Sequence, residues 1–167
     1  SGEYGYIEPG PDPNDGYINL HDAHEANCIP NYAFCSNSRL LRIVLPNKLE
    51  KIGREAFFSC SNLTGSLIIP EGVVEIGQLA FRDCWSLTGT LSLPSTLKKI
   101  DSHGFLGCGF TCELVLPDNL TYIGDIAFGY SNNLYGSLNF PDKLTYLGAE
   151  AFRGCGNLSG NIEIPQN

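Results

Sequence analysis

Hydrophobic residues recur along this chain with a fixed period, and a proline marks the same point of each period. Successive marker prolines lie 24, 24, 23, 24 and 24 residues apart. The markers are Pro46, Pro70, Pro94, Pro117, Pro141 and Pro165. Between them the chain follows the pattern P-x-x-L-x-x-I-G-x-x-A-F-x-x-C-x-x-L-x-G-x-L-x-L, with one residue deleted in the third copy. Such a repeat is typical of a solenoid, in which each copy forms one coil.

A short strand ends each repeat. Its residues alternate between inward apolar and outward positions, with a glycine before the strand and a proline after it. Proline cannot donate a hydrogen bond to a neighbouring strand, so pairing stops at the marker and the chain turns. The pattern therefore predicts strands at residues 67–69, 91–93 and 114–116, and at the equivalent positions of the other repeats.

A second extended stretch and a turn follow each proline. Leu49 and Ile52 are inward apolar residues, and Gly53 follows them where we expect a turn to need a permissive backbone. Residues 54–57 predict one helical turn that points Phe57 into the core. A single coil has too few apolar side chains to offset the entropy of ordering its backbone. The coils must therefore stack and share one core.

The start of the chain differs from the repeats. Residues 1–27 contain six acidic and no basic side chains, whereas residues 28–167 contain 12 acidic and 10 basic ones. Three prolines and two glycines between positions 9 and 16 favour turns. We expect an acidic linker or irregular segment at 1–16 and a solenoid at 17–167. Within the solenoid, an irregular capping repeat at 17–45 precedes full repeats that start at Pro46, Pro70, Pro94, Pro117 and Pro141.

Composition and motifs exclude several classes of protein. The formal charge of −8 argues against a nucleic-acid partner, which would select a basic face. No stretch approaches the ~20 apolar residues of a membrane span, so we expect no direct membrane insertion of this segment. No nucleophile elbow, phosphate loop or acid pair indicates an enzyme. We interpret His21, His24 and the acidic run at 12–16 as solvated, and predict no metal site and no cofactor.

The repeat also resembles a known family. The motif C-x-x-L-T-x-x-L-x-I/L-P-x-x-L-x-x-I-G-x-x-A-F is similar to the leucine-rich repeat of the BspA-like, or treponemal, subclass, found in bacterial surface proteins and some mucosal protists. The match covers residues 17–167 and recurs in register over five full copies. The sequence departs from it at Ser131 in the cysteine position, at Cys112 in a glycine position, and at His103-Gly104 before Phe105.

The resemblance implies a right-handed leucine-rich-repeat coil with short parallel strands, a second extended side and single helical turns. It further implies a cell-surface or secreted protein. Because relatives are associated with adhesion, it points to a protein partner such as a host extracellular or other cell-surface protein. It supplies no catalytic residues.

Seven cysteines raise the question of disulfides. Cys60, Cys84, Cys108 and Cys155 occupy the same position of the repeat, so they should stack at the ~4.8 Å spacing of strands. This spacing exceeds the ~3.5–4.5 Å between Cβ atoms that a disulfide needs. We predict buried free thiols that pack as small apolar groups. Cys28 and Cys35 lie outside this row, and for them both a bridge and free thiols remain open.

Outward positions of the predicted strands form two rows along the solenoid and are the first candidate partner-binding surface. Val44 and Ile68 would form a small apolar strip rimmed by polar groups. The candidate residues are Arg42, Val44, Ser66, Ile68, Thr90, Ser92, Glu113, Val115, Ser137 and Asn139.

Tyr122 and Tyr146 form the second candidate, because they share one outward position of the other extended side and should be neighbours. Paired exposed aromatics bind sugars or act as protein hot spots, but ladders of like residues also stabilise sheets. We predict a non-catalytic module for protein–protein interaction or adhesion through its solenoid faces. The alternatives are a carbohydrate-binding module that uses the two tyrosines, and a structural spacer for another domain of a longer protein.

Overall fold

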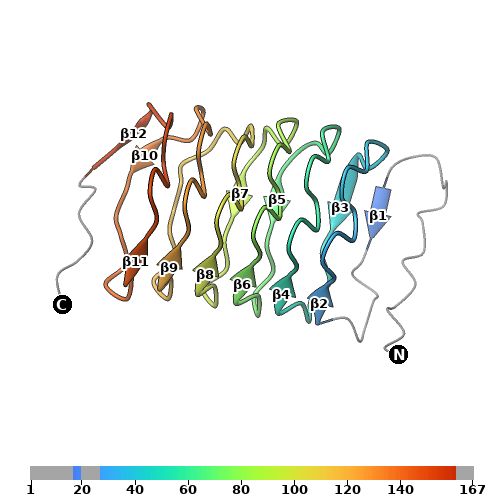
Figure 1. The fold of residues 1–167 in the computed structure, drawn as a ribbon, viewed down its shortest axis with the longest axis horizontal. Helices are drawn as coiled ribbons and strands as arrows, with labels where there is room; N and C mark the ends of the chain where they lie inside the picture. The colour runs from blue at the N-terminus through green and yellow to red at the C-terminus, as the bar shows by residue number, and fades with distance from the viewer. Residues whose placement is uncertain (1–16, 20–26, 161–167) are drawn as a thin grey trace.

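The computed structural model describes residues 17–19 and 27–160, which form a solenoid of stacked coils and contain no helix. The coils follow one another along a nearly straight axis (Figure 1). Strand pairs in the described part of the chain are parallel, as expected when each strand comes from a successive coil. The predicted solenoid is thus confirmed, while the predicted linker at 1–16 lies outside the described residues.

One sheet runs through the whole described solenoid, and we call it the continuous sheet. It is built from the second extended stretch of each repeat, where the first strand residue faces outward and the second faces the core. Its strands follow one another along one edge of the molecule (Figure 1). In spatial order they are β2 (Cys28–Ile29), β4 (Lys51–Ile52), β6 (Glu75–Ile76), β8 (Lys99–Ile100), β9 (Tyr122–Ile123) and β11 (Tyr146–Leu147).

The strands before the prolines form only separate pairs, and we call this side the interrupted face. The pairs are β1 (Tyr17–Asn19) with β3 (Arg42–Val44), β5 (Leu67–Ile68) with β7 (Leu91–Ser92), and β10 (Gly136–Ser137) with β12 (Leu158–Ser159). The strands predicted at 67–69 and 91–93 are confirmed, each one residue shorter. The strand predicted at 114–116 is wrong, because this segment has only an isolated bridge between Glu113 and Tyr135.

The residue deleted from the third repeat explains this break. The Leu91 N–H has no carbonyl opposite it and instead donates to Cys112 Sγ, at 3.4 Å. On the next coil, the Leu114 N–H donates to the Tyr135 carbonyl at 3.0 Å. The shortened coil therefore shifts the pairing of the strands that follow it.

Tight turns replace the predicted helical turn at 54–57. Glu55 and Ser59 have positive φ angles of 53° and 56°, which are incompatible with a right-handed helix. The N–H groups of alternate residues point to the next coil: Glu55, Phe57 and Ser59 donate to carbonyls of Gln78, Ala80 and Arg82. The same three hydrogen bonds recur between every neighbouring pair of described coils, so this region forms a regular wall that we call the turn wall.

Phenylalanines pack behind the turn wall in one stacked row. Neighbouring ring centroids are 5.0 to 5.5 Å apart, and the rings are nearly parallel. All except Phe152 are buried. The row consists of Phe34, Phe57, Phe81, Phe105, Phe128 and Phe152.

The cysteine row lies beside the phenylalanines and consists of buried free thiols, as predicted. Each thiol donates to the carbonyl of a phenylalanine on the preceding coil, as Cys60 Sγ does to Phe34 at 3.0 Å. Ser131 takes over the same role with its hydroxyl, at 3.3 Å from the Phe105 carbonyl. Burial raises the pKa of the Cys60 thiol to about 11. Cys28 and Cys35, for which a bridge was left open, are free thiols.

The repeat glycines of the continuous sheet have a different role from the one expected. A Cβ atom at Gly124 would lie 2.3 Å from the Ser102 backbone nitrogen, and one at Gly148 would lie 2.3 Å from that of Asp125. Neither glycine has a positive φ. The coils need glycine here because their backbones approach too closely for a side chain, and the expected need for backbone freedom is wrong.

Candidate interaction faces

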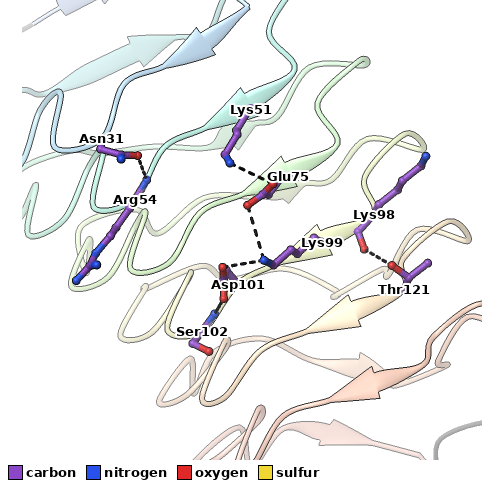
Figure 2. A network of polar contacts seen from close by, with 9 residues as sticks. All are labelled: Asn31, Lys51, Arg54, Glu75, Lys98, Lys99, Asp101, Ser102 and Thr121. Atoms are coloured by element: carbon purple, nitrogen blue, oxygen red, sulfur yellow. Dashed lines mark hydrogen bonds and ion pairs between the residues drawn. The ribbon is translucent and has the colours of Figure 1, made fainter.

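The outward side chains of the continuous sheet form a connected polar row. Lys51 Nζ lies 3.3 Å from Glu75 Oε2, and Lys99 Nζ lies 3.8 Å from Glu75 Oε1. Lys99 also pairs with Asp101 at 3.0 Å, and this hydrogen bond is the main cause that raises the pKa of Lys99. Figure 2 shows how these four side chains point toward one another across three neighbouring strands.

Polar side chains also satisfy the backbone between the coils of this sheet. Asn31 Oδ1 accepts the Arg54 N–H at 2.8 Å, and the Thr121 hydroxyl donates to the Lys98 carbonyl at 3.1 Å (Figure 2). Asp125 Oδ1 likewise accepts the Ala149 N–H of the next coil at 2.9 Å, while Asp101 Oδ1 accepts the Ser102 N–H within one coil at 2.7 Å. Side chains on this side of the solenoid are thus committed to holding neighbouring coils together.

Tyr122 and Tyr146 are neighbours, as the repeat predicts, and continue the polar row. Their rings stack face to face, with centroids 4.5 Å apart and planes 10° apart. Lys99 Nζ lies over the Tyr122 ring at 5.1 Å. The Tyr146 hydroxyl donates to Asp125 Oδ1 at 3.2 Å, and the negative charge of Asp125 raises the pKa of Tyr146.

This stacking limits what the tyrosine pair can bind. A sugar ring binds an aromatic side chain through the face of its ring. Tyr122 has Lys99 on one side and Tyr146 on the other, so its faces are covered. Within the described residues, only the outer face of Tyr146 is left for a ligand. The geometry therefore favours a ladder that stabilises the sheet.

The outward side chains of the interrupted face, unlike the paired and stacked ones of the continuous sheet, are exposed and include apolar residues. All ten residues predicted for it from the sequence are exposed. Ile68 and Val115 have the largest exposed fractions among the apolar side chains described, 69% and 67%. Arg42 and Glu113 form no ion pair with any described residue. Large exposed apolar side chains amid small polar ones are typical of a surface that a partner covers.

The predicted rows are in register between β5 and β7. The Thr64, Gly89 and Thr111 N–H groups donate to the carbonyls of Leu41, Gly65 and Gly89 just before the strand positions. Ile68 pairs with Ser92, and the Thr90 N–H donates to Ser66 Oγ at 2.9 Å. The structure therefore brings together Ser66, Ile68, Thr90 and Ser92, whereas Arg42–Val44 pairs with Tyr17–Asn19 of β1.

The register changes after the third repeat. Glu113 bridges to Tyr135 and not to Ser137, which the repeat would place beside it. Ser137 and Asn139 are exposed but displaced from the rows formed by the earlier coils. Tyr135, which is 51% exposed, takes this place and was missed by sequence reasoning. The deletion in the third repeat was the signal that could have revealed it.

Other chemistry on the described surface is sparse. No group of three or more histidines, cysteines or acids among the described residues is arranged to hold a metal ion. His21, His24 and the acidic run at 12–16 lie outside the residues that the structure describes. In the part of the chain searched, no helix has the length and apolar character needed to cross a membrane.

Comparisons with solved structures find other bacterial repeat proteins. A leucine-rich repeat protein from Bacteroides ovatus has 34% identity and a TM-score of 0.68, over 78% of this chain and 33% of that one. The leucine-rich repeat protein of T. pallidum has 27% identity and a TM-score of 0.66, over 95% of this chain and 68% of that one. A leucine-rich cell surface protein from Faecalibacterium prausnitzii has 26% identity and a TM-score of 0.52, over 79% of this chain and 39% of that one.

The chain thus spans only about a third of the Bacteroides ovatus protein. No curated protein matches it. The sequence profile of the BspA type leucine rich repeat region matches residues 27–167 with six copies. This match covers well over half of the sequence, agrees with the stacked coils of the structure, and shows that the chain belongs to the BspA-type leucine-rich-repeat family.

Proposed function

We propose that this protein is a non-catalytic interaction module that binds another protein through the interrupted face. The exposure of Ile68 and Val115 amid small polar side chains is the observation that carries this proposal. Covering such side chains removes apolar surface from water, which favours association. The family supports a protein partner, because leucine-rich-repeat proteins typically bind proteins.

The contrast with the continuous sheet supports the choice of face. On the sheet, lysines and acids pair with one another and the tyrosines stack, so a partner would have to displace existing contacts. On the interrupted face, Ile68, Val115 and Glu113 are exposed and form no ion pair or ring stack with the described residues. Binding there gains interactions and breaks few.

A location at the cell surface or outside the cell fits this role. The family and the similarity to a Faecalibacterium prausnitzii cell surface protein support it. The same solenoid can also act as a spacer for another domain, since two of the similar proteins are much longer than the region they share with this chain.

An array of purified extracellular proteins, with this protein itself among them, tests the proposed binding face. We expect wild type to bind at least one protein, and Ile68→Arg with Ser92→Arg to abolish this binding. Val74→Arg, at an exposed apolar residue next to the continuous sheet, is the matched control and should bind normally. Equal melting temperatures would show that all variants are folded. Loss of binding in the control alone, or no protein binding by wild type, contradicts the proposal.

Carbohydrate binding is the second candidate, and the exposed outer face of Tyr146 is the observation that favours it. A glycan array tests it directly. We expect a carbohydrate-binding module to lose its signal in Tyr146→Ala and to keep it in Tyr135→Ala, which changes an exposed tyrosine on the other side. Absence of saccharide binding, or binding that Tyr146→Ala leaves intact, excludes this role.

A further inference from the structure

We propose that the turn wall carries a binding site for a neutral sugar ring, between Trp85 and Tyr130. The site is separate from the interrupted face and from Tyr146, so it goes beyond the proposed function. Its parts come from three consecutive coils, those of the second, third and fourth full repeats. They are two exposed aromatic rings, a stretch without side chains, and a carboxylate with one free oxygen.

The coil of the third repeat has no side chain at two positions of the turn wall, Gly107 and Gly109, which we call the glycine gap. Asp83, Gly107 and Tyr130 make the same hydrogen bond of the wall in successive coils, so they occupy one position of the repeat. A Cβ atom at Gly109 would lie 2.3 Å from the Trp85 carbonyl oxygen. At both glycines, the three atoms nearest to such a Cβ belong to the preceding coil. At these two positions, only backbone therefore lies between the coils of Trp85 and Tyr130.

Trp85 and Tyr130 border the glycine gap from opposite sides. Their exposed fractions are 57% and 52%. The indole of Trp85 forms no hydrogen bond, ring stack or cation contact with the described residues. Tyr130 has Arg153 of the following coil over one face, at 5.6 Å, which leaves its other face on the side of Gly107. Coils two apart lie ~10 Å from each other and carbon atoms in contact lie ~4 Å apart, so one further ring fits between them.

Asp83 adds a polar edge to the glycine gap. A Cβ atom at Gly107 would lie 3.0 Å from Asp83 Oδ1, which places the carboxylate beside the gap. Asp83 Oδ2 pairs with Arg82 Nε at 3.3 Å, whereas Oδ1 accepts no hydrogen bond from a described residue. The site thus offers a free acceptor, with a guanidinium next to it as a donor.

A sugar ring matches this combination of groups. Its C–H groups pack on aromatic faces, and the hydroxyls on its rim donate to a carboxylate. An apolar protein side chain would cover Asp83 Oδ1 without giving it a donor. Because Arg82 already pairs with Asp83, a cation would gain little from this acid. Nucleotides and acidic sugars would bring negative charge to a chain with a formal charge of −8, so the sugar should be neutral.

Trp85 is the one tryptophan of the chain, so its fluorescence reports directly on this site. The emission, excited where tyrosine does not absorb, is followed during titration with cellobiose, chitobiose, lactose and mannobiose, which present common neutral pyranoses. An array of immobilised neutral glycans is probed in parallel. We expect at least one of these sugars to shift the emission in a saturable way, and the array to retain the protein on glycans that contain it.

Three substitutions around the glycine gap test the assignment of residues. Trp85→Ala should lose the glycan signal on the array. Tyr130→Ala and Asp83→Ala keep the fluorescent reporter and should raise the dissociation constant at least about tenfold.

Two substitutions elsewhere on the turn wall are the matched controls. Tyr32 is 51% exposed, as Tyr130 nearly is, and Glu55 pairs with the preceding Arg54 at 3.2 Å, as Asp83 does with Arg82. Tyr32→Ala and Glu55→Ala should bind sugar like wild type. Equal melting temperatures would show that all variants are folded.

No response to any of these sugars, or glycan binding that survives Trp85→Ala, overturns the site. Loss of binding in Tyr146→Ala alone would place the sugar on the continuous sheet. If Trp85→Ala loses protein binding while no glycan binds wild type, the turn wall is a protein site and the sugar is wrong. The Ile68→Arg and Ser92→Arg variant should keep sugar binding, so this site and the proposed function can fail independently.

Discussion

The continuous sheet and the interrupted face come from the same repeat, yet they differ in how their side chains are used. On the continuous sheet, residues at one repeat position meet in an unbroken row from Cys28 to Tyr146, and from Lys51 onward each contacts the next. On the interrupted face, the equivalent rows contain exposed Ile68 and Val115, and Arg42 and Glu113, which form no ion pair with a described residue. Side-chain pairing along the solenoid thus separates a structural face from one that is free to bind.

The difference has a backbone cause as well. The turn wall and the continuous sheet keep every coil in register, whereas the deletion in the third repeat is absorbed entirely on the interrupted face. Cys112 and Tyr135 take the positions that a regular coil would give to other residues. One side of the solenoid can therefore vary while the other maintains the fold.

Removing a ring from the phenylalanine row should have the largest effect. Phe105 is fully buried and stacks against both Phe81 and Phe128, so Phe105→Ala would leave a large cavity in the core that the continuous sheet and the interrupted face share. We expect a loss of about 3–5 kcal/mol in the free energy of unfolding, measured with guanidinium chloride. Phe105→Leu is the control and should lose clearly less. A loss below about 1 kcal/mol for the alanine variant would show that the faces do not depend on this row.

Alkaline pH should weaken the shared core next. Burial raises the pKa of the Cys60 thiol from its ordinary value of 9.0 to about 11. The unfolded chain loses its proton first, so this contribution to stability is complete below pH 9 and is lost as the pH rises through 11.

Cys60→Ser removes this ionisable group while keeping a donor for the Phe34 carbonyl, as Ser131 does at the equivalent position. Its stability, followed by circular dichroism from pH 8 to 11, should fall less steeply than that of wild type. If the stability of the two proteins falls equally steeply with pH, the fold does not raise the pKa of this thiol. Cys35→Ser, which changes a partly exposed thiol, is the control.

A methyl group at Gly124 should affect the continuous sheet selectively. Its Cβ would lie 2.3 Å from the Ser102 nitrogen, so the two coils would have to separate. We expect Gly124→Ala to lose about 1–3 kcal/mol in thermal unfolding. Gly156→Ala is the matched control, since no described atom lies within 4 Å of its Cβ position, and should change stability by less than about 0.5 kcal/mol. Equal effects of the two changes would contradict the close approach.

The charged row of the continuous sheet should contribute least. Glu75 lies between Lys51 and Lys99, and all three side chains are partly exposed. We expect Glu75→Gln to lose about 0–1 kcal/mol at low salt and less at high salt, because exposed ion pairs are screened. Urea unfolding at the two salt concentrations measures this. A loss of several kcal/mol that salt does not change would show that the row is more than a surface network.

Much of the fold follows from the sequence because the repeat reports the inward positions directly. Leu49, Ile52 and Phe57 are buried as their spacing predicts. The pattern could not exclude a helical turn at 54–57, because the spacing of apolar residues does not report the backbone conformation. Glu55 adopts a positive φ angle that no apolar pattern predicts. The role of Gly124 also depends on the distance between coils, which only the assembled solenoid determines.

The candidate sites show the same limit. Tyr122 and Tyr146 are adjacent as predicted, but the covered faces of Tyr122 depend on side-chain conformations. The rows hold between β5 and β7, whereas Ser137 is displaced because a single deletion alters the register beyond it. Periodicity predicts neighbours only where every coil has the same length.

Hydrogen exchange of the wild-type protein, alone and with the protein that it binds on the array, tests most directly whether the interrupted face is the one that binds. We predict that amides in segments 66–69 and 90–93 gain protection when that protein is added, while those of β4, β6 and β8 keep the same exchange rates. Added protection on the continuous sheet, or association without any change at the interrupted face, would contradict the assignment of the binding face.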